Sequence, residues 1–514
     1  MKEKVWKTVD EVHKHAKISV NKKVRDLVTS QTLKKYYDKK NNKGWIGNSI
    51  ESDWFGVPNN RRREADIPYL GLEIKVTPIK KTKKGWSAKE RLVLNIFDFK
   101  DEYKRTFENA SFFEKSNLIE LIYYEYKKGV ESPELKIKKA TLLNLYDLPK
   151  KDLLVIEQDW NIIINKIKEG KAEELSDSLT KYLGATTKGG KTEENFTKQP
   201  FSNTKAHKRS FTLKATFMSE LAKKIMAEPD ENESIIKNIN ELKEKSFEEL
   251  IIEKFNPYVG KSKDELALHF NIKIPEKNDK ASNFRLAKKM LNVKGEIEKT
   301  DEFKKANIAV KTLTIDSKNK KSTEGFKLII PREISIEPEE LKNQKWEDSS
   351  LREYLLSQQF LLIVFEKQKE RIIFKGVKFW HISYEDLESV IKNTWEKTRD
   401  ILNEGVKLEY KTRNKPTSKG KLYQVHNNLP GLNNSKVLHV RPSADYSCYY
   451  NNPSLAMKLP TKARWINKPE KTDWIDDKKP VEVPKRELTD WYMTRQMWWL
   501  NHKYMYKQVV ELFE

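Results

Sequence analysis

The sequence predicts an α/β protein in which one fold is duplicated in tandem. Its 514 residues are too many for one ordinary hydrophobic core, because single cores stop growing at about 250 to 300 residues. Helical and strand periodicities alternate along the chain, and four segments of the first half recur in the same order in the second half. The hydrophobic share of 37% is enough to build such cores and excludes a wholly disordered chain.

The repeat sets the expected domain boundaries. The first copy occupies residues 1–226 and the second residues 258–514, with residues 227–257 between them as a charged connector. The connector begins with an acidic stretch that contains a proline, and the apolar spacing over residues 234–253 then predicts a helix. The matched pairs are 20–27 with 259–266, 66–79 with 302–315, 117–125 with 359–367 and 209–212 with 486–489.

The charge balance indicates the class of partner. The formal net charge is +24, which favours polyanions, either nucleic acid or an acidic membrane face. No apolar run approaches the roughly 18 residues of a membrane-spanning helix, and residues 1–10 lack the apolar core of a signal peptide. A single cysteine, Cys448, excludes an intrachain disulfide and a cysteine-rich zinc site. We therefore expect a soluble, cytoplasmic protein that binds nucleic acid and no membrane.

A candidate active site lies on an expected strand. Apolar and polar residues alternate over residues 70–77, which predicts a half-buried strand with Glu73 and Lys75 side by side on one face. Asp66 lies seven residues before Glu73. The proline and Gly71 between them allow a turn that brings Asp66 back beside the strand. Carboxylates in this arrangement can hold a magnesium ion at a scissile phosphate, and a lysine can orient the attacking water. The motif alone also fits a strand with an exposed ion pair.

The neighbouring sequence carries a family resemblance. Glu51 ends a short expected helix that follows Lys43, and Lys115 precedes an apolar strand. This set resembles MutH, the GATC-specific mismatch-repair endonuclease. It is more similar to staphylococcal-type restriction enzymes that carry two MutH-like domains in tandem and cut before the G of GATC, and the similarity to these enzymes extends to residues 87–96, 119–126 and 158–160.

The resemblance implies a fold and a set of roles. Each domain is expected to be of the PD-(D/E)xK type, a mixed sheet flanked by helices. Mg²⁺ is the implied cofactor, and Lys43 is an implied DNA contact. The implied catalytic residues are Asp66, Glu73, Lys75, Glu51 and Lys115, of which Asp66, Glu73 and Glu51 bind the metal.

The resemblance also implies where DNA is read. MutH reads its site with an Arg-Pro-Lys loop, and Arg441 and Pro442 come close to that pattern in the second half. Arginine suits guanine because its planar fork can donate two hydrogen bonds to the major-groove edge. The first half has Lys188 at the comparable place and no Arg-Pro. Further DNA contacts are expected at Arg209 and Thr212 and at Arg486 and Thr489, although a solvated basic face is the alternative for residues 205–214.

The function that these resemblances imply is a type II restriction endonuclease whose second domain has lost catalysis. Ala309 aligns with Glu73 and Ser357 with Lys115, while Glu302 is a possible replacement for Asp66 and Lys311 keeps the position of Lys75. We expect this domain to bind a second site as an allosteric effector. Two chains are expected to dimerise on palindromic double-stranded DNA, with a companion DNA methyltransferase in the cell. The alternatives are a mismatch-repair nickase and a DNA-binding regulator without catalysis.

Overall fold

The computed structural model describes residues 4–38, 44–58, 63–82, 85–190, 192–228, 232–274, 280–328, 336–412, 423–444, 447–468 and 488–514. The chain divides into two compact units. The first comprises Met1–Pro257, Ala287–Val310 and Ser357–Phe360, and the second comprises Tyr258–Leu286, Lys311–Leu356 and Leu361–Glu514. None of the described helices is long and apolar enough to cross a membrane.

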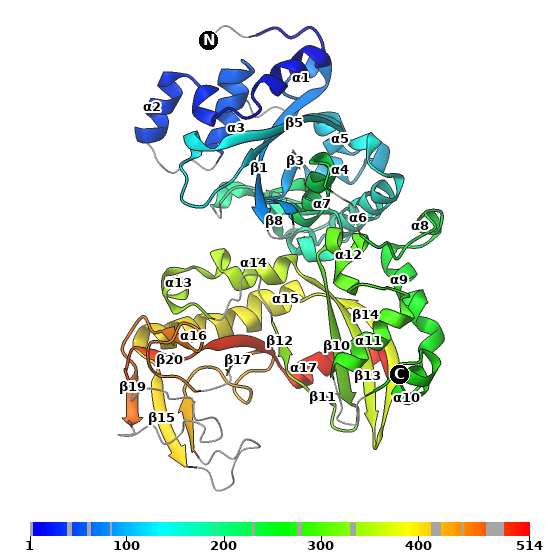
Figure 1. The fold of residues 1–514 in the computed structure, drawn as a ribbon, viewed down its shortest axis with the longest axis vertical. Helices are drawn as coiled ribbons and strands as arrows, with labels where there is room; N and C mark the ends of the chain where they lie inside the picture. Colours follow the sequence, from blue (N-terminus) through cyan, green and yellow to red (C-terminus); the bar gives the residue numbers. More distant parts are fainter. Residues whose placement is uncertain are drawn as a thin grey trace. The chain divides into compact units, whose positions relative to one another are not determined.

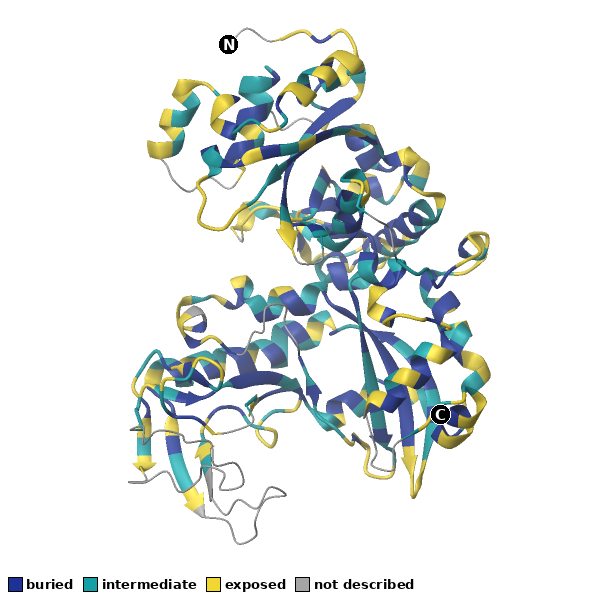
Figure 2. Cartoon of the chain, viewed as in Figure 1, coloured by how far each residue is buried: buried dark blue, intermediate teal, exposed yellow. Residues whose placement is uncertain are grey.

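The first unit is built on a mixed sheet of order β2-β1-β4-β5. Strand β1 (Leu72–Thr82) runs parallel to β4 (Leu118–Glu125), whereas β2 (Gly85–Ala88) and β5 (Lys136–Asn144) are antiparallel to their neighbours. Helix α1 (Val9–Ile18) contacts β4 and β5, and α3 (Trp45–Ser49) and α5 (Ser111–Ser116) contact β1 (Figure 1). The alternation of apolar and polar residues predicts that one face of β1 is exposed. In the structure the consecutive residues Leu72, Glu73 and Ile74 are all buried, so both faces are covered at the start of the strand (Figure 2).

A second, antiparallel sheet of order β3-β9-β6 completes this unit. Its strands are Leu92–Phe97, Arg209–Leu213 and Leu183–Thr187 for β3, β9 and β6. The other elements of the first part of the chain are α2 (Ser30–Asp38), α4 (Phe99–Glu102), α6 (Lys150–Lys168), the hairpin β7 (Phe196–Lys198) and β8 (Lys205–His207), and α7 (Ala215–Ile225).

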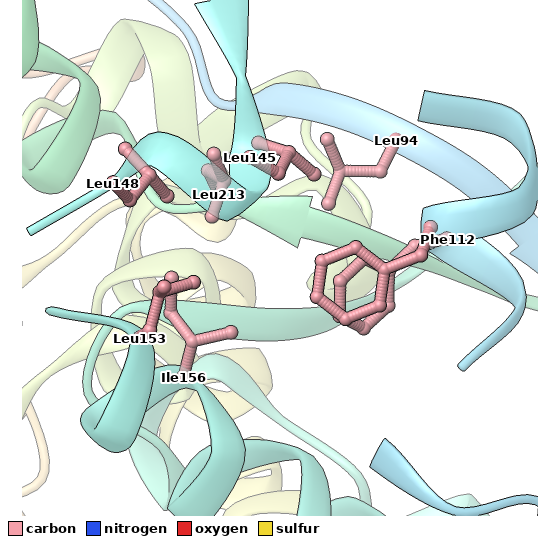
Figure 3. A pocket seen from close by; sticks show the side chains of 8 residues that line it. Leu94, Phe112, Leu145, Leu148, Leu153, Ile156 and Leu213 are labelled. Carbon is pink, nitrogen blue, oxygen red and sulfur yellow. The ribbon is translucent and has the colours of Figure 1, made fainter. Parts of the chain in front are cut away.

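A small apolar cavity lies in this part of the core. It holds only about 10 Å³, roughly the room of one water molecule, and its lining has no polar partner for one. It is therefore a gap in the packing and too small for a substrate. Its lining is shown in Figure 3 and consists of Leu94, Phe112, Phe113, Leu145, Leu148, Leu153, Ile156 and Leu213.

The second part of the chain repeats this architecture, as the sequence predicts. Its larger sheet has the order β11-β10-β13-β14, the same chain order as β2-β1-β4-β5. Strand β10 (Ile308–Asp316) begins at Ile308, the residue that the predicted repeat aligns with Leu72, where β1 begins. The isolated bridge between Lys23 and Lys136 also has its counterpart, between Ser262 and Ile373. The other three strands are β11 (Lys321–Ser322), β13 (Gln359–Gln368) and β14 (Arg371–Trp380).

The second copy of the smaller sheet corrects one of the four predicted matches. Its order β12-β21-β17 corresponds to β3-β9-β6, with bounds Phe326–Lys327, Gln496–Leu500 and Leu438–Pro442. In β6 and β9 Leu183 pairs with Leu213, and in β17 and β21 Leu438 pairs with Leu500. The register therefore aligns the strand Arg209–Leu213 with Gln496–Leu500, and not with residues 486–489 as the sequence suggests.

The connector also differs from its prediction. In place of one helix over residues 234–253, the chain forms α8 (Glu241–Glu244) and α9 (Phe247–Phe255). A capping box of Ser246 and Glu249 starts α9 and so separates the two.

The remaining elements belong to the second half of the chain. The helices are α10 (Lys263–His269), α11 (Lys280–Met290), α12 (Asp301–Ala306), α13 (Pro338–Asn343), α14 (Ser350–Ser357), α15 (Tyr384–Asp386), α16 (Lys392–Glu404) and α17 (His502–Lys507). The strands are β15 (Lys407–Thr412), β16 (Tyr423–Asn427), β18 (Ala456–Lys458), β19 (Arg464–Asn467) and β20 (Tyr492–Thr494).

Candidate active site

The start of β1 brings the predicted Asp, Glu and Lys together. Glu73 is only 2% exposed, and Lys75, two residues along the same face, places its Nζ 2.5 Å from Glu73 Oε1. Gly71 adopts φ +59°, a left-handed conformation that favours glycine and lets the chain turn back into the strand. The returning segment is fixed by two hydrogen bonds: the Asp66 amide donates to Glu73 Oε2 (3.1 Å), and the Ile74 amide donates to Asp66 Oδ2 (2.9 Å).

Lys115 joins this group from the end of α5. The following strand, β4, lies parallel to β1 with Ile119 opposite Glu73, so the chain just before β4 runs beside the site. Lys115 Nζ lies 3.4 Å from Glu73 Oε2 and donates a hydrogen bond to the carbonyl oxygen of Glu64 (2.8 Å). Glu73 therefore lies between two ammonium groups.

Glu51 approaches from a short π-helical turn, Ile50–Trp54, that continues α3. Such turns are rare and occur frequently at functional sites. Burial raises the pKa of Glu51 to about 7, and the charge of Asp66 adds to the rise, while Lys75 and Lys115 act against it. Burial likewise raises the pKa of Glu73 in spite of its two lysines. The five predicted catalytic side chains thus form one electrostatically coupled cluster.

The donor set of this cluster fits a hard divalent cation. It offers carboxylate oxygens, the ligands that magnesium prefers, and burial raises the pKa of two of the carboxyl groups, Glu51 and Glu73, although Lys75 and Lys115 lie nearby. Within the described residues, however, no three His, Cys, Asp or Glu side chains converge as a ready metal cage. The side chains are gathered, and the oxygens of Glu73 and Asp66 accept from lysines and backbone amides.

The predicted DNA contacts of the first unit divide into exposed and buried residues. Lys188 is exposed just beyond β6. Arg209 and Thr212 are buried on β9, and the Arg209 guanidinium donates to the carbonyl oxygens of Ala185 (3.1 Å) and Glu173 (3.2 Å). These contacts hold Arg209 inside the unit, and Thr212 Oγ1 donates to the carbonyl oxygen of Gly184 (3.5 Å). The stretch 205–214 is only partly a solvated basic face, because Lys205 and Lys208 are exposed whereas Arg209 and Lys214 lie inside the unit.

The predicted contacts of the second unit lie at the end of β17. Arg441 and Pro442 are exposed, and the Arg441 guanidinium lies 4.8 Å from the ring centre of Trp499. Thr489 is half-buried, and its amide donates to the carbonyl oxygen of Tyr449 (2.9 Å). Lys43 and Arg486 lie outside the described residues. Sequence spacing gave no signal for Trp499, because its partner is 58 positions away and they meet only through strand pairing.

Glu302 does not replace Asp66 in the second copy. It lies on α12, fully buried, and accepts hydrogen bonds from the Lys151 ammonium, the Ser234 hydroxyl and the backbone amides of Ile235 and Ile236. These partners hold the pKa of Glu302 below its usual value, against the effect of burial. Both carboxylate oxygens of Glu302 thus accept hydrogen bonds from within the protein.

Comparisons with known proteins agree with this geometry. Residues 55–159 match the protein-family model described as "DNA mismatch repair enzyme MutH". The type II restriction enzyme Sau3AI of Staphylococcus aureus is 37% identical over 98% of this chain and 99% of its own length. The MutH protein of Shewanella oneidensis is 22% identical over 42% of this chain and 95% of its own length, and that of Pasteurella multocida is 24% identical over 30% and 65%. A whole MutH chain thus corresponds to less than half of this one.

Proposed function

This chain belongs to the family of MutH-related type II restriction endonucleases, which are site-specific deoxyribonucleases, and we propose that it makes magnesium-dependent double-strand cuts at GATC, before the G. The observation that carries the proposal is the cluster of Glu51, Asp66, Glu73, Lys75 and Lys115 in the first unit. The likeness over nearly the full length to a restriction enzyme favours this function over a mismatch-repair nickase.

Each residue of the cluster has a proposed task. Asp66, Glu73 and Glu51 hold Mg²⁺, which when bound stabilises negative charge on the scissile phosphate. The Lys75 ammonium, 2.5 Å from Glu73, orients the attacking water and offsets the charge of the phosphate group. Lys115, anchored on the Glu64 carbonyl, keeps Glu73 in place and adds a second positive charge. Burial of the cluster strengthens these interactions because little water screens them.

The second unit is proposed to bind DNA without cutting it. The second copy of the repeat has Ala309 and Ser357 in place of Glu73 and Lys115, and its Glu302, which groups with them in the first unit, is held by Lys151 and backbone amides. Arg441, in contrast, is exposed at the end of β17. A unit that keeps an arginine for base reading but has lost the carboxylates suits an effector that binds a second copy of the site.

Two further partners follow from the proposed reaction. One active centre per chain cuts one strand, so two chains are expected to meet on a palindromic site. A companion DNA methyltransferase is expected in the same cell, since a GATC-specific nuclease would otherwise cut its host's DNA.

Digestion of unmethylated plasmid with magnesium, followed by sequencing of the fragment ends, tests this proposal. Discrete fragments that all begin at GATC support it. Nicked circles indicate the mismatch-repair alternative, and intact but bound plasmid indicates the regulator. Fragments with other end sequences contradict the proposed specificity.

A further inference from the structure

A row of three side chains crosses the smaller sheet of the second unit. Strand pairing places Lys327 of β12 opposite Trp499 of β21, and Trp499 opposite His439 of β17. Directly paired residues point to the same face of a sheet, and Arg441, two residues after His439, points to that face as well. The face therefore presents a lysine, a tryptophan, a histidine and an arginine together.

The side-chain cations of Arg441 and Lys327 both lie near the ring of Trp499. The Arg441 guanidinium lies 4.8 Å and the Lys327 ammonium 6.0 Å from the ring centre of Trp499. Lys327 Nζ also donates to Ser443 Oγ (2.9 Å), just beyond β17. Among the described residues, no carboxylate forms an ion pair with Lys327 or Arg441. Two adjacent positive charges to which the described residues supply no counter-ion favour an anionic ligand.

The arginine is held in place rather than extended freely into solvent. A Cβ on Gly325 would lie 2.9 Å from Arg441 Nη1 and 2.9 Å from Trp499 Cε3, so this glycine lets the backbone pass close to both. A guanidinium stacked on an aromatic ring keeps the edges of its planar fork free for hydrogen bonds. The geometry is thus suited to presenting that fork to a ligand.

Two members of the row have buried polar atoms without hydrogen-bond partners among the described residues. His439 is fully buried, and neither of its ring nitrogens has a hydrogen-bond partner in the described part of the chain; the same holds for Trp499 Nε1. Burial and the nearby Arg441 lower the pKa of His439 to about 4, so the imidazole is neutral and adds no charge. Buried polar groups without hydrogen-bond partners destabilise the fold. Their presence here is consistent with a site in which a ligand supplies the missing partners.

The first unit shows that the fold itself does not require this row. The equivalent strand register places Val93, Thr212 and Gly184 at the positions of Lys327, Trp499 and His439. A Cβ on Gly184 would lie 2.3 Å from Asp177 Oδ1, and Asp177 pairs with Arg91 at 2.5 Å. In the first unit an acidic residue thus packs against the row, whereas in the second unit the row is cationic and aromatic.

We propose that Lys327, Trp499 and Arg441 form one DNA-contacting surface of the second unit, in which Trp499 positions Arg441 against a guanine edge and Lys327 contacts a backbone phosphate. This inference rests on the proposed function of the second unit and adds to it two residues that have no counterpart in the first. Double-stranded DNA fits the surface because it offers phosphate anions beside bidentate acceptors in the major groove.

Binding of short duplexes to the full chain, without divalent cation and over a series of salt concentrations, tests the surface. Arg441→Gln should weaken one binding step, and that step is assigned to the second unit. Lys327→Gln is expected to weaken that same step equally for cognate and scrambled duplexes and to reduce its salt slope by about one. Lys321→Gln, an exposed lysine of β11, is the matched control and should change neither quantity.

The role of Trp499 is separated from simple charge by specificity. Trp499→Leu is expected to reduce the preference for the cognate duplex by about tenfold or more, the effect of losing one bidentate base contact. Trp499→Phe, which keeps an aromatic face, should retain most of that preference. Thermal melting of each variant checks that the fold is intact.

The outcomes distinguish this inference from the function on which it rests. A Lys327→Gln protein that behaves like Lys321→Gln overturns the surface, as does a folded Trp499→Leu protein with full cognate preference, even when Arg441→Gln is defective. If Arg441→Gln weakens no binding step, the proposed DNA-binding role of the second unit fails, and the surface fails with it. If the wild-type chain also cuts no DNA, the endonuclease proposal fails as a whole.

Discussion

At the candidate active site of the first unit, burial dominates the pKa shifts of single carboxyl groups. Glu73 has ammonium groups at 2.5 and 3.4 Å, yet its pKa is raised, because loss of water costs the carboxylate more than the lysines return. The sequence could predict which residue types gather here, since strand alternation and family resemblance both indicate them. It could not predict the direction of their pKa shifts, which depends on how α3, α5 and β1 enclose them.

The first prediction concerns the Lys75 ammonium. Lys75→Met should lower the cleavage rate by roughly a hundredfold or more, the usual effect of removing one group that stabilises charge in the transition state. Lys80→Met, five residues along β1 and away from the cluster, should cut at nearly the wild-type rate. Single-turnover cleavage of a GATC duplex measures both, and equal rates for the two variants would remove Lys75 from the site.

A second prediction concerns Glu120, a buried carboxyl group on β4 whose Oε2 lies 2.9 Å from His13 Nδ1. Burial raises its pKa from 4.5 to about 8, with Lys17 acting against the rise. A raised folded-state pKa means that the carboxyl group's contribution to stability is full below about pH 4.5 and is lost as the pH rises through about 8. Unfolding free energy should therefore fall with pH, by at most about 1.4 kcal/mol per pH unit.

Urea unfolding of Glu120→Gln between pH 5 and pH 9 checks this titration. The variant should lack the decline, because glutamine does not titrate, whereas Glu131→Gln, an exposed glutamate, should decline like the wild type. A Glu120→Gln protein with the wild-type pH dependence would show that a group other than Glu120 causes the decline in stability.

Among the elements, strands were more predictable than connections. The alternation of residues 70–77 and the turn at Gly71 indicated β1 and its returning segment, and both are present. The connector was predicted as one helix because its apolar spacing continues across Ser246, although Ser246 and Glu249 carry a local capping signal. The fourth repeat match was wrong because a short polar motif holds little information, and only strand register shows that Arg209–Leu213 aligns with Gln496–Leu500.

A third prediction concerns the buried ion cluster that joins α12 to α6. Lys305 is nearly fully buried, and its Nζ lies 2.7 Å from Asp152 and 2.9 Å from Asp301. Lys305→Met should lower the unfolding free energy by about 3 to 5 kcal/mol, because it leaves the buried Asp152 carboxylate without its ion-pair partner. Lys299→Met, in an exposed pair with Glu296, should cost under about 1 kcal/mol. Chemical unfolding compares them, and similar costs would contradict a stabilising role for this buried ion cluster.

For the whole molecule, the duplication was evident in the sequence, and the two large sheets repeat the same strand order. The sequence did not predict that part of the second copy joins the first unit. Ala287–Val310 and Ser357–Phe360 group with the first unit, although they belong to the second copy in sequence. That grouping arises from tertiary contacts, such as those of Glu302 and Lys305 with α6, which no local pattern encodes.

A fourth prediction concerns the number of chains on one site. Because each chain has one complete cluster and a palindrome has two equivalent phosphates, two chains should assemble on a cognate duplex before both strands are cut. Light scattering with the inactive Glu73→Gln chain and a GATC duplex measures the stoichiometry. Cutting of both strands by a complex that holds a single chain would contradict it.

The most direct test of the account compares cleavage and binding of one GATC duplex by the wild type, Glu73→Gln and the control Glu131→Gln. Glu73 is the residue that Lys75, Lys115 and the Asp66 amide all contact, so its neutral amide should disable the cluster as a whole. We expect Glu73→Gln to cut at least about a hundredfold more slowly while binding the duplex within a few-fold of the wild type, and Glu131→Gln to match the wild type in both. A Glu73→Gln chain that still cuts before the G of GATC at the wild-type rate would contradict the claim that this cluster is the active site.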